Sequence, residues 1–236
     1  GHYYPLTAMS DNLVTYLNSA LIDGKIHQAQ VLINGELGKF PFIDNSGTFI
    51  VDAELEEAKF KFNERWPTIA DLSANLNFTN NSMLITGRSG SLAGLNVAGV
   101  QVAIDDLTHD QVLTVDTLIE DSAATSIANL ITQSSLKNSV GSVLQQLNIG
   151  GKVNGEFHLA LPIGAPDGVV ASGIVNFANN TVSLQAPRMD FKKVNGQLTF
   201  ENDLITTSNL SLTWLGLPLE IAVNGIDKAD YYDTNI

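Results

Sequence analysis

Hydrophobic residues occupy every second position over several stretches of the chain. Between Leu72 and Phe78 they alternate with serine and asparagine, and the alternation recurs over 100–104, 210–214 and 217–223. Successive side chains of a strand point to opposite faces, so each stretch predicts a strand with one apolar and one polar face. Turn-forming pairs separate the stretches: Asn80-Asn81, Ala93-Gly94, Asn179-Asn180 and Leu215-Gly216. Short turns of this kind predict antiparallel meanders.

Two stretches show helical spacing instead. Residues 11–23 place Leu13, Val14, Leu17 and Leu21 on one helical face, and Gly24 follows as a stop. Residues 122–147 carry apolar residues at i, i+3, i+4 and i+7, which predicts one helix or a broken pair. The expected fold class is therefore mainly β with minor α.

An internal repeat organises these elements. With an offset of 122 residues, Leu76, Phe78 and Asn80 align with Leu198, Phe200 and Asn202. With an offset of 127, Gly24-Lys25 aligns with Gly151-Lys152, and each pair follows a predicted helix. We predict two tandem units, 1–120 and 121–236. Each consists of an amphipathic helix and an antiparallel meander sheet that curls into an open, taco-like groove.

Composition narrows the class of protein. Apolar residues make up 44% of the 236 residues and charged residues 16%, which indicates a folded chain. A net charge of −13 argues against nucleic acid as a partner and against simple electrostatic docking on an anionic membrane. The absence of cysteine excludes disulfides and thiolate chemistry. No run of about 18 apolar residues exists, so we expect no membrane-spanning helix here. The chain begins with glycine and not with methionine, and we therefore interpret it as a fragment of a longer protein.

Catalytic and cofactor motifs are incomplete. The four histidines lack a second ligand at metal-site spacing, and His109 between acidic residues is interpreted as part of a polar loop. The stretch 87–91 lacks the final glycine of a nucleophile elbow, and Gly151-Lys152 lacks the remainder of a phosphate-binding loop. We therefore predict no catalytic residue, no metal and no cofactor. An enzyme whose other residues lie outside this fragment is the least favoured hypothesis.

The apolar faces of the predicted strands exceed what two short helices could cover. We predict that they bind an apolar ligand. The side chains expected to line the groove are Leu76, Phe78, Leu95, Val97, Leu198, Phe200, Trp214, Leu217 and Leu219. The alternative is a structural β scaffold for envelope organisation or adhesion, with its apolar faces fully self-buried.

The most distinctive passage, residues 60–72, reads Phe-Lys-Phe-Asn-Glu-Arg-Trp-Pro-Thr-Ile-Ala-Asp-Leu. It resembles the Phe-x-Phe, Trp-Pro and Asp-Leu passage of the YhdP family, in the AsmA-like group of Gram-negative bacteria. The resemblance extends over most of the chain, although the second unit has no Trp-Pro motif. Pro67 favours an extended Trp66, so we expect this pair to form a structural corner between two strands.

The resemblance implies a function and a location. Proteins of this group are long periplasmic proteins anchored in the inner membrane, and they form β-grooves from repeats. They are implicated in moving phospholipid between the inner and outer membranes. The implied partners are phospholipid acyl chains and adjacent repeats of the same chain joined through sheet edges, while the membranes are contacted outside this fragment. The fragment itself would be non-enzymatic.

Overall fold

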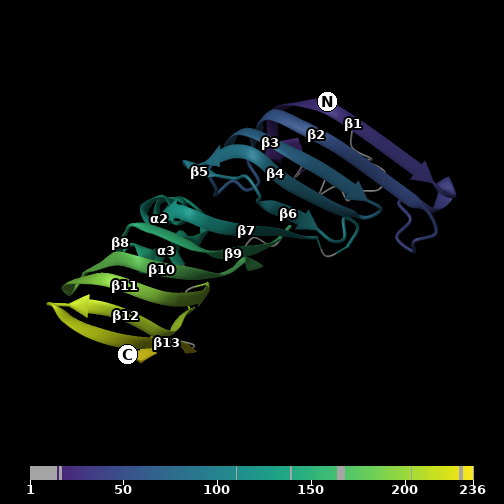
Figure 1. The fold of residues 1–236 in the computed structure, drawn as a ribbon. Helices are drawn as coiled ribbons and strands as arrows, with labels where there is room; N and C mark the ends of the chain where they lie inside the picture. The colour runs from purple at the N-terminus through teal and green to yellow at the C-terminus, as the bar shows by residue number, and fades with distance from the viewer. Residues whose placement is uncertain are drawn as a thin grey trace. The chain divides into compact units, whose positions relative to one another are not determined.

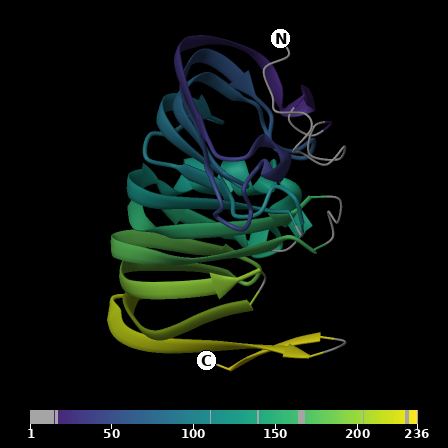
Figure 2. The same ribbon diagram turned by 90° about the vertical axis from the view of Figure 1, so that its right-hand side faces the viewer.

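The computed structural model describes residues 15, 18–109, 111–138, 140–163, 168–202, 204–228 and 231–235. The chain forms two compact units. Unit 1 comprises Gly1–Asp116 and Leu159–Val169, and unit 2 comprises Thr117–His158 and Val170–Ile236. Within each unit, antiparallel strands lie side by side (Figures 1 and 2). The expectation of a mainly β, antiparallel fold with little helix is confirmed.

Unit 1 is a meander in which each long strand pairs with the one before it in the sequence. Its strands are β1 (Leu21–Asn34), β2 (Thr48–Phe60), β3 (Ile69–Thr79), β4 (Ser82–Leu92), β5 (Leu95–Asn96), β6 (Gln101–Ile104) and the first part of β7 (Val112–Ala123). The short β5 pairs only with β4, and the 3-10 helix η2 (Leu37–Lys39) lies between β1 and β2. The two-residue connection between β3 and β4 is compatible only with antiparallel pairing, because parallel strands need a crossover of a dozen or more residues.

Unit 2 continues the same type of pairing after a helical insertion. The insertion consists of α2 (Ala124–Thr132), η3 (Ser135–Asn138) and α3 (Val140–Leu144). Figure 1 places α2 and α3 beside β8, and both helices contact that strand. The strands that follow are β8 (Leu147–Gly150), β9 (Lys152–Pro162), β10 (Val170–Gln185), β11 (Arg188–Glu201), β12 (Leu204–Trp214), β13 (Leu217–Lys228) and β14 (Tyr231–Asn235). The end of β9, from Leu159 on, belongs to unit 1.

Helix boundaries depart from the sequence-based expectation in both places. The stretch 122–147 forms a broken helical pair, which was one of the two expected alternatives, but its ends differ: β7 extends to Ala123, and Leu147 starts strand β8, where it pairs with Leu184 of β10. The predicted helix over 11–23 is wrong for its last three residues, since Leu21 starts β1 and pairs with Phe60 of β2. Gly24 consequently lies inside a strand. Leu13, Val14 and Leu17 are outside the described residues.

The turns at Asn80, Ala93 and Leu215 form as predicted, each with a positive φ at the named residue. The turn predicted at Asn179-Asn180 is wrong, because both residues lie inside β10. There the register with β11 shifts, and Asn179 adopts a φ of 60°. The side-chain amide of Asn180 donates to the carbonyls of Gly150 and Lys152, both at 2.9 Å. These bonds satisfy a buried polar group at a β-bulge.

Register shifts recur 122 residues apart. The pairing of β2 with β3 shifts after Leu55, and the pairing of β10 with β11 shifts after Phe177. The pairing of β3 with β4 shifts after Ala70, and the pairing of β11 with β12 shifts after Lys192. A bulge bends its strand and increases the local twist, so both three-strand sets are bent at corresponding places.

Two asparagines also correspond at this spacing. The side-chain oxygen of Asn80 accepts the backbone N–H of Phe49 at 2.9 Å, and that of Asn202 accepts the backbone N–H of Ala171 at 3.0 Å. The backbone N–H of each asparagine donates in return to the carbonyl of the same partner. Each asparagine lies in the turn at the end of one strand and therefore ties that turn to the start of the preceding strand, β2 for Asn80 and β10 for Asn202.

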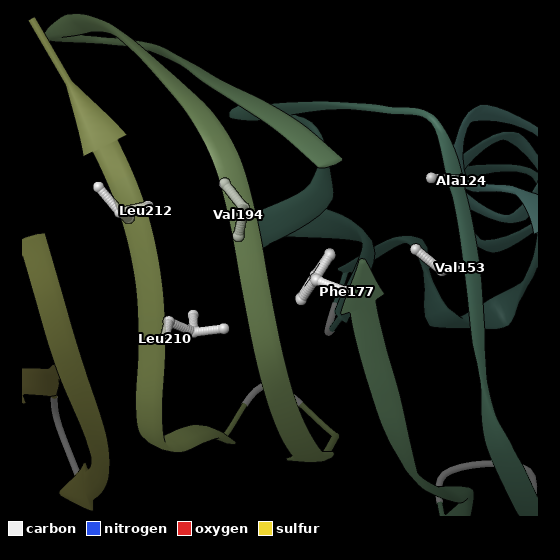
Figure 3. Close-up of a cluster of buried hydrophobic side chains, with 6 residues drawn as sticks. All are labelled: Ala124, Val153, Phe177, Val194, Leu210 and Leu212. Atoms are coloured by element: carbon white, nitrogen blue, oxygen red, sulfur yellow. The ribbon is translucent and has the colours of Figure 1, made fainter. Parts of the chain in front are cut away.

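The hydrophobic cores lie on one face of the strands. Among the described residues of unit 1, one buried cluster lies around Ile104 and Leu113 and another around Leu72 and Ala74. Unit 2 has a cluster to which β9, β10, β11, β12 and α2 contribute (Figure 3). Its members are Ala124, Val153, Phe177, Val194, Leu210 and Leu212. In each unit the polar positions of the alternating stretches fall on the other face.

Candidate functional site

The apolar face of unit 1 extends from the core to an exposed edge. Residues paired across neighbouring strands share a face, and one such row crosses five strands. It consists of Val31, Val51, Phe78, Met83 and Ile104, on β1, β2, β3, β4 and β6. Ile104 and Met83 are buried, Val51 and Phe78 are half-buried, and Val31 is 62% exposed. Cover over the apolar face is therefore lost towards β1.

Strand β1 carries further exposed apolar side chains. Ile26 is paired with Leu55 and Ile33 with Phe49, which places both on the same face as Val31. Leu32 lies on the opposite face, and its exposed fraction of 53% is similar to that of Val31. Among the described residues, β1 pairs only with β2, so its second edge is open. The alternation of apolar residues in β1 was a usable sequence signal, but sequence reasoning did not place these residues in the site.

Unit 2 has a corresponding row that ends at β13. It consists of Ile149, Val182, Phe191, Trp214 and Leu217, on β8, β10, β11, β12 and β13. The first four side chains are half-buried, whereas Leu217 is 65% exposed. Leu219, on the same face, is 39% exposed although its partner Leu212 is buried. In this unit the apolar face is least covered at β13.

The predicted groove residues divide by unit and by depth. Leu76 and Phe78 pack against the cores of unit 1, and Leu198 and Trp214 pack against the core of unit 2. The remaining members are described by their exposure. Val97 is buried, Leu95 and Phe200 are half-buried, and Leu217 and Leu219 are exposed.

Phe200 illustrates how closely the apolar face of unit 2 is packed. Its ring lies 6.4 Å from that of Phe157, measured between centroids. A Cβ atom at Gly173 would come within 2.8 Å of the Phe200 ring. Glycine at position 173 therefore makes room for an aromatic side chain on the face that sequence reasoning assigned to the ligand.

Trp66 and Pro67 lie in the connection between β2 and β3. The Trp66 ring is buried, and its centroid lies 5.0 Å from that of Phe62. The backbone N–H of Trp66 donates to the carbonyl of Asn63 at 3.1 Å, which closes the turn. The geometry gives Trp66 a packing contact at this place in the chain.

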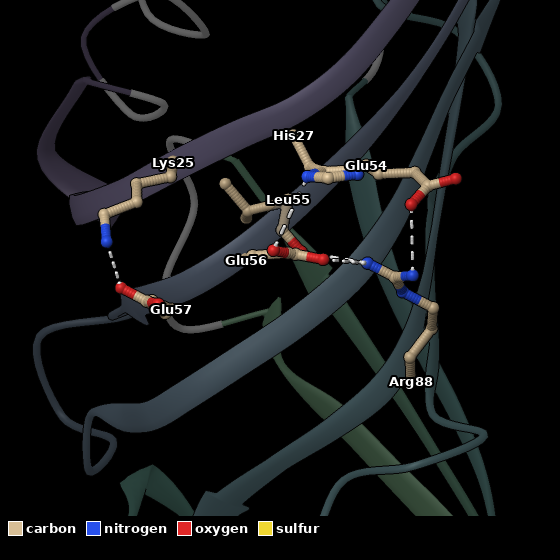
Figure 4. A network of polar contacts seen from close by, with 7 residues as sticks. All are labelled: Lys25, His27, Glu54, Leu55, Glu56, Glu57 and Arg88. Atoms are coloured by element: carbon tan, nitrogen blue, oxygen red, sulfur yellow. Dashed lines mark hydrogen bonds and ion pairs between the residues drawn. The ribbon is translucent and has the colours of Figure 1, made fainter.

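The opposite face of unit 1 carries a network of charged side chains (Figure 4). Arg88 approaches Glu54 at 3.2 Å and Glu56 at 3.8 Å, and His27 Nδ1 lies 3.9 Å from Glu56. Lys25 pairs with Glu57, and the hydrogen bond and charge of that carboxylate raise the pKa of Lys25. Exposed ion pairs of this type contribute little to stability. They make this face a solvated one, in contrast to the aliphatic face behind it.

The acidic loop after β6 is arranged around Asp106. The Asp106 carboxylate accepts hydrogen bonds from the backbone N–H of Thr108 at 2.7 Å and of His109 at 3.2 Å. Burial alone would raise the pKa of Asp106, but hydrogen bonds from Thr108, Asn81 and His109 outweigh it and lower the pKa to about 2. Within the described part of the chain, no group of three or more acidic or histidine side chains could hold a metal ion. The cluster therefore has the geometry of a tight polar loop.

The fold and its faces define a class: an antiparallel β protein in which each unit has an apolar sheet face that is least covered at one strand, β1 in unit 1 and β13 in unit 2. None of the helices in the described ranges has the length and hydropathy needed to cross a membrane. The family model described as YhdP protein matches residues 1–236, so the chain belongs to the YhdP family, as the passage 60–72 indicated.

The chain is also similar to a curated relative, the intermembrane phospholipid transporter YhdP of Escherichia coli strain K12. The two are 27% identical over 234 residues, which is 99% of this chain and 18% of the relative. The chain thus spans about a fifth of the length of the relative that it matches. No solved structure matches the chain.

Proposed function

We propose that this chain is a non-enzymatic, lipid-conducting segment of a YhdP-family envelope protein, in which the apolar sheet faces bind phospholipid acyl chains. The observation that carries the proposal is the exposure of Val31 and Leu217 on faces that are otherwise core. Rows of buried and half-buried apolar side chains lead directly to these side chains, so the apolar surface is continuous within each unit. The relative from Escherichia coli is named as an intermembrane phospholipid transporter, which supports the same substrate class.

The aliphatic character of the sheet faces suits movement of a lipid along them better than tight binding at one place. Each methylene removed from water gains about 0.8 kcal/mol, so a 16-carbon chain gains on the order of 10 kcal/mol before ordering costs. Aliphatic side chains such as Val31, Leu76 and Leu217 offer this gain without directional hydrogen bonds. A lipid could therefore shift along the face through a series of similar contacts.

The proposal includes an arrangement in the envelope. Two tandem units, 1–120 and 121–236, would each present a curled, groove-like face, and the recurrence of bulges and asparagine bonds 122 residues apart supports duplication. The open edge of β1 would pair with an adjacent repeat of the parent chain. The segment would lie in the periplasm, in a parent anchored in the inner membrane. Membrane anchoring is then a property of the parent.

A structural β scaffold is the second candidate, because part of the expected groove is core. Val97, one of the expected groove residues, is buried, and so are Met83 and Ile104 in the row that crosses unit 1. If the same held for the whole of each face, no surface would remain for a ligand. The exposed ends of the two rows are what distinguish the two candidates.

Native mass spectrometry with lipid extraction on the purified chain tests the proposal. Val31→Glu places a charge on the apolar face of β1, and Leu32→Glu places one on its opposite face at similar exposure. We expect Val31→Glu to reduce co-purifying phospholipid about tenfold, because a charge beside an acyl chain loses solvation. Leu32→Glu should change it less than about twofold.

Circular dichroism and thermal unfolding show whether both variants fold. If the wild-type chain carries no lipid and takes up no photo-crosslinkable phospholipid, the proposal is wrong and the scaffold is favoured. Equal loss of lipid in the two folded variants would also contradict it, since binding would then not depend on the apolar face.

A further inference from the structure

The turn between β12 and β13 exposes more apolar surface than other turns with a similar backbone. Leu215, at the turn itself, is 81% exposed, and Leu217 follows it on β13. The stretch 214–219 reads Trp-Leu-Gly-Leu-Pro-Leu and carries no charge. In unit 1 the turn at the corresponding position has Ala93 in place of this leucine, and Leu95 after it is half-buried. The turn of unit 2 is therefore an uncovered apolar tip.

Cationic side chains stand next to this tip. The register pairs Phe191 with Trp214 and Lys192 with Thr213, so β11 brings Lys192 and Lys193 beside the start of the turn. Arg188 lies at the β10–β11 turn at the same end of the unit. All three cations are exposed and form no ion pair with another described residue, while the nearby acidic residues on β11 and β13 are Asp190 and Glu220.

The helical insertion adds to this imbalance of charge. The backbone N–H of Gln185 donates to the carbonyl of Gln146 at 3.1 Å, which joins the insertion to the β10–β11 turn. Residues 122–155 contain no aspartate or glutamate and include Lys137. In a chain with a net charge of −13, this end of unit 2 is locally cationic.

We infer that this end, formed by Arg188, Lys192, Lys193 and residues 214–219 and here called the cationic tip, docks on the surface of a bilayer that contains anionic phospholipids. Leu215 and Leu217 would enter the boundary between headgroups and acyl chains, and the cations would lie at the lipid phosphates. Trp214, half-buried behind them, has the amphipathic ring that is enriched at such interfaces. A protein partner of the same hydrophobicity would not by itself require the unpaired cations.

This inference goes beyond the proposed function and does not depend on it. Leu217 belongs to the apolar sheet face, so its substitution would affect both. Leu215 lies in the turn outside both strands, and its substitution separates docking on a bilayer from binding of single lipids. The net charge of −13 disfavours docking of most of the protein surface on an anionic bilayer. Docking through the cationic tip would therefore hold the chain in one orientation on the bilayer.

Vesicle flotation tests the inference on the 236-residue chain. We expect binding to vesicles of phosphatidylcholine mixed with phosphatidylglycerol, little binding to phosphatidylcholine alone, and release by salt. Leu215→Asp should weaken binding at least tenfold, and Lys192→Gln and Lys193→Gln about fivefold each. The matched control is Leu37→Asp, which changes an exposed leucine in unit 1 and should bind as the unaltered chain does.

Tryptophan fluorescence provides a second readout, because the chain has only two tryptophans. In a Trp66→Phe variant the emission comes from Trp214 alone and should shift to the blue on anionic vesicles. Binding to neither kind of vesicle overturns the inference, as does unchanged binding of Leu215→Asp or equal binding to neutral and anionic vesicles. Co-purifying phospholipid should be unchanged in Leu215→Asp, so failure here is distinguishable from failure of the proposed function.

Discussion

The segments that follow the turns after β4 in unit 1 and after β12 in unit 2 pair differently with the strand before the turn. In unit 1 only the two-residue strand β5 pairs with β4, and residues 97–99 then lie against β4 in an irregular fold-back. In unit 2 the long strand β13 pairs with β12 in a regular ladder over residues 217–221. In unit 1 the backbone N–H of Val97 donates to Gly90 and that of Gly99 donates to Gly87, at 3.2 and 2.9 Å. In unit 2 the corresponding positions on β12 are Asn209 and Leu212. The fold-back buries Val97 to 5% exposure, while Leu219, 122 residues further on, stays 39% exposed.

The difference shows that burial on these faces depends on the neighbouring strand more than on the residue itself. Valine and leucine are both apolar, and both stand two residues after the first residue of the strand that follows the turn. The two units differ in whether the strand before the turn, β4 or β12, leaves space for the backbone of the following segment to pack against it. A Cβ at Gly87 would come within 2.3 Å of the Val97 carbonyl oxygen, so only glycine admits the fold-back there.

The largest expected effect comes from removing that glycine. Gly87→Asn places in unit 1 the residue found at the corresponding position of unit 2. The new side chain meets backbone rather than a flexible side chain, so the free energy of unfolding should fall by about 3 kcal/mol. Urea unfolding measures the change.

Gly38→Ala is the control, since a Cβ at that position meets nothing within 4 Å. Its effect should stay within about 0.5 kcal/mol. If Gly87→Asn were equally neutral, the fold-back would not depend on the glycine. The residue at this position would then not explain why Val97 is buried and Leu219 is exposed.

A smaller effect is expected from truncating the two corresponding apolar residues. Val97→Ala removes buried methyl groups and should lower the free energy of unfolding by about 2 kcal/mol. Leu219→Ala removes a larger side chain but a less covered one, and should cost less than about 1 kcal/mol. The two variants are compared in one urea series. A larger loss of stability in Leu219→Ala than in Val97→Ala would show that the exposed face of unit 2 is covered in solution.

The smallest expected effect is on the stability of the protein at low pH. The lowered pKa of Asp106 means that its ionised form is favoured by folding, so its contribution is present above the unfolded pKa near 4 and is lost as the pH falls through about 2. Position 228, 122 residues further on, is a lysine, so no carboxylate stands at the corresponding position of unit 2. Asp106→Asn should therefore flatten the pH dependence of stability in this window.

The size of that change should not exceed about 1 kcal/mol, because the Asp106 side chain is 40% exposed and screened by solvent. Urea midpoints at several pH values between about 2 and 5 give the measurement. An identical slope in Asp106→Asn and the unaltered chain would mean that other carboxylates set the acid limit.

Much of the fold was predictable because local and tertiary preferences agree over most strands. The alternation over 72–78 and the turns at Asn80 and Leu215 were sufficient to predict the meander. Prediction failed where a distant partner decides the structure. Leu21 has helical neighbours in the sequence, but pairing with Phe60 makes it the start of a strand.

The apolar faces were predictable, but the depth of each residue on them was not. Period-two spacing places Leu76 and Leu219 correctly on sheet faces. It carries no information on which strand lies at an edge, and so it did not distinguish buried Val97 from exposed Leu217. The exposure of Leu215 was hidden for the same reason, since a turn pair alone does not say what packs over it.

The sequential pairing of strands has a consequence for how the chain acquires its structure. In unit 1, β2, β3, β4 and β6 each pair with the strand before them, apart from the short β5, and the connections range from two residues between β3 and β4 to 13 between β1 and β2. Closing a short loop costs little entropy, and contacts close in sequence favour rapid folding. Hairpins can therefore be added one at a time in the order of synthesis. A segment delivered across a membrane as an extended chain would build its sheet from the end that emerges first.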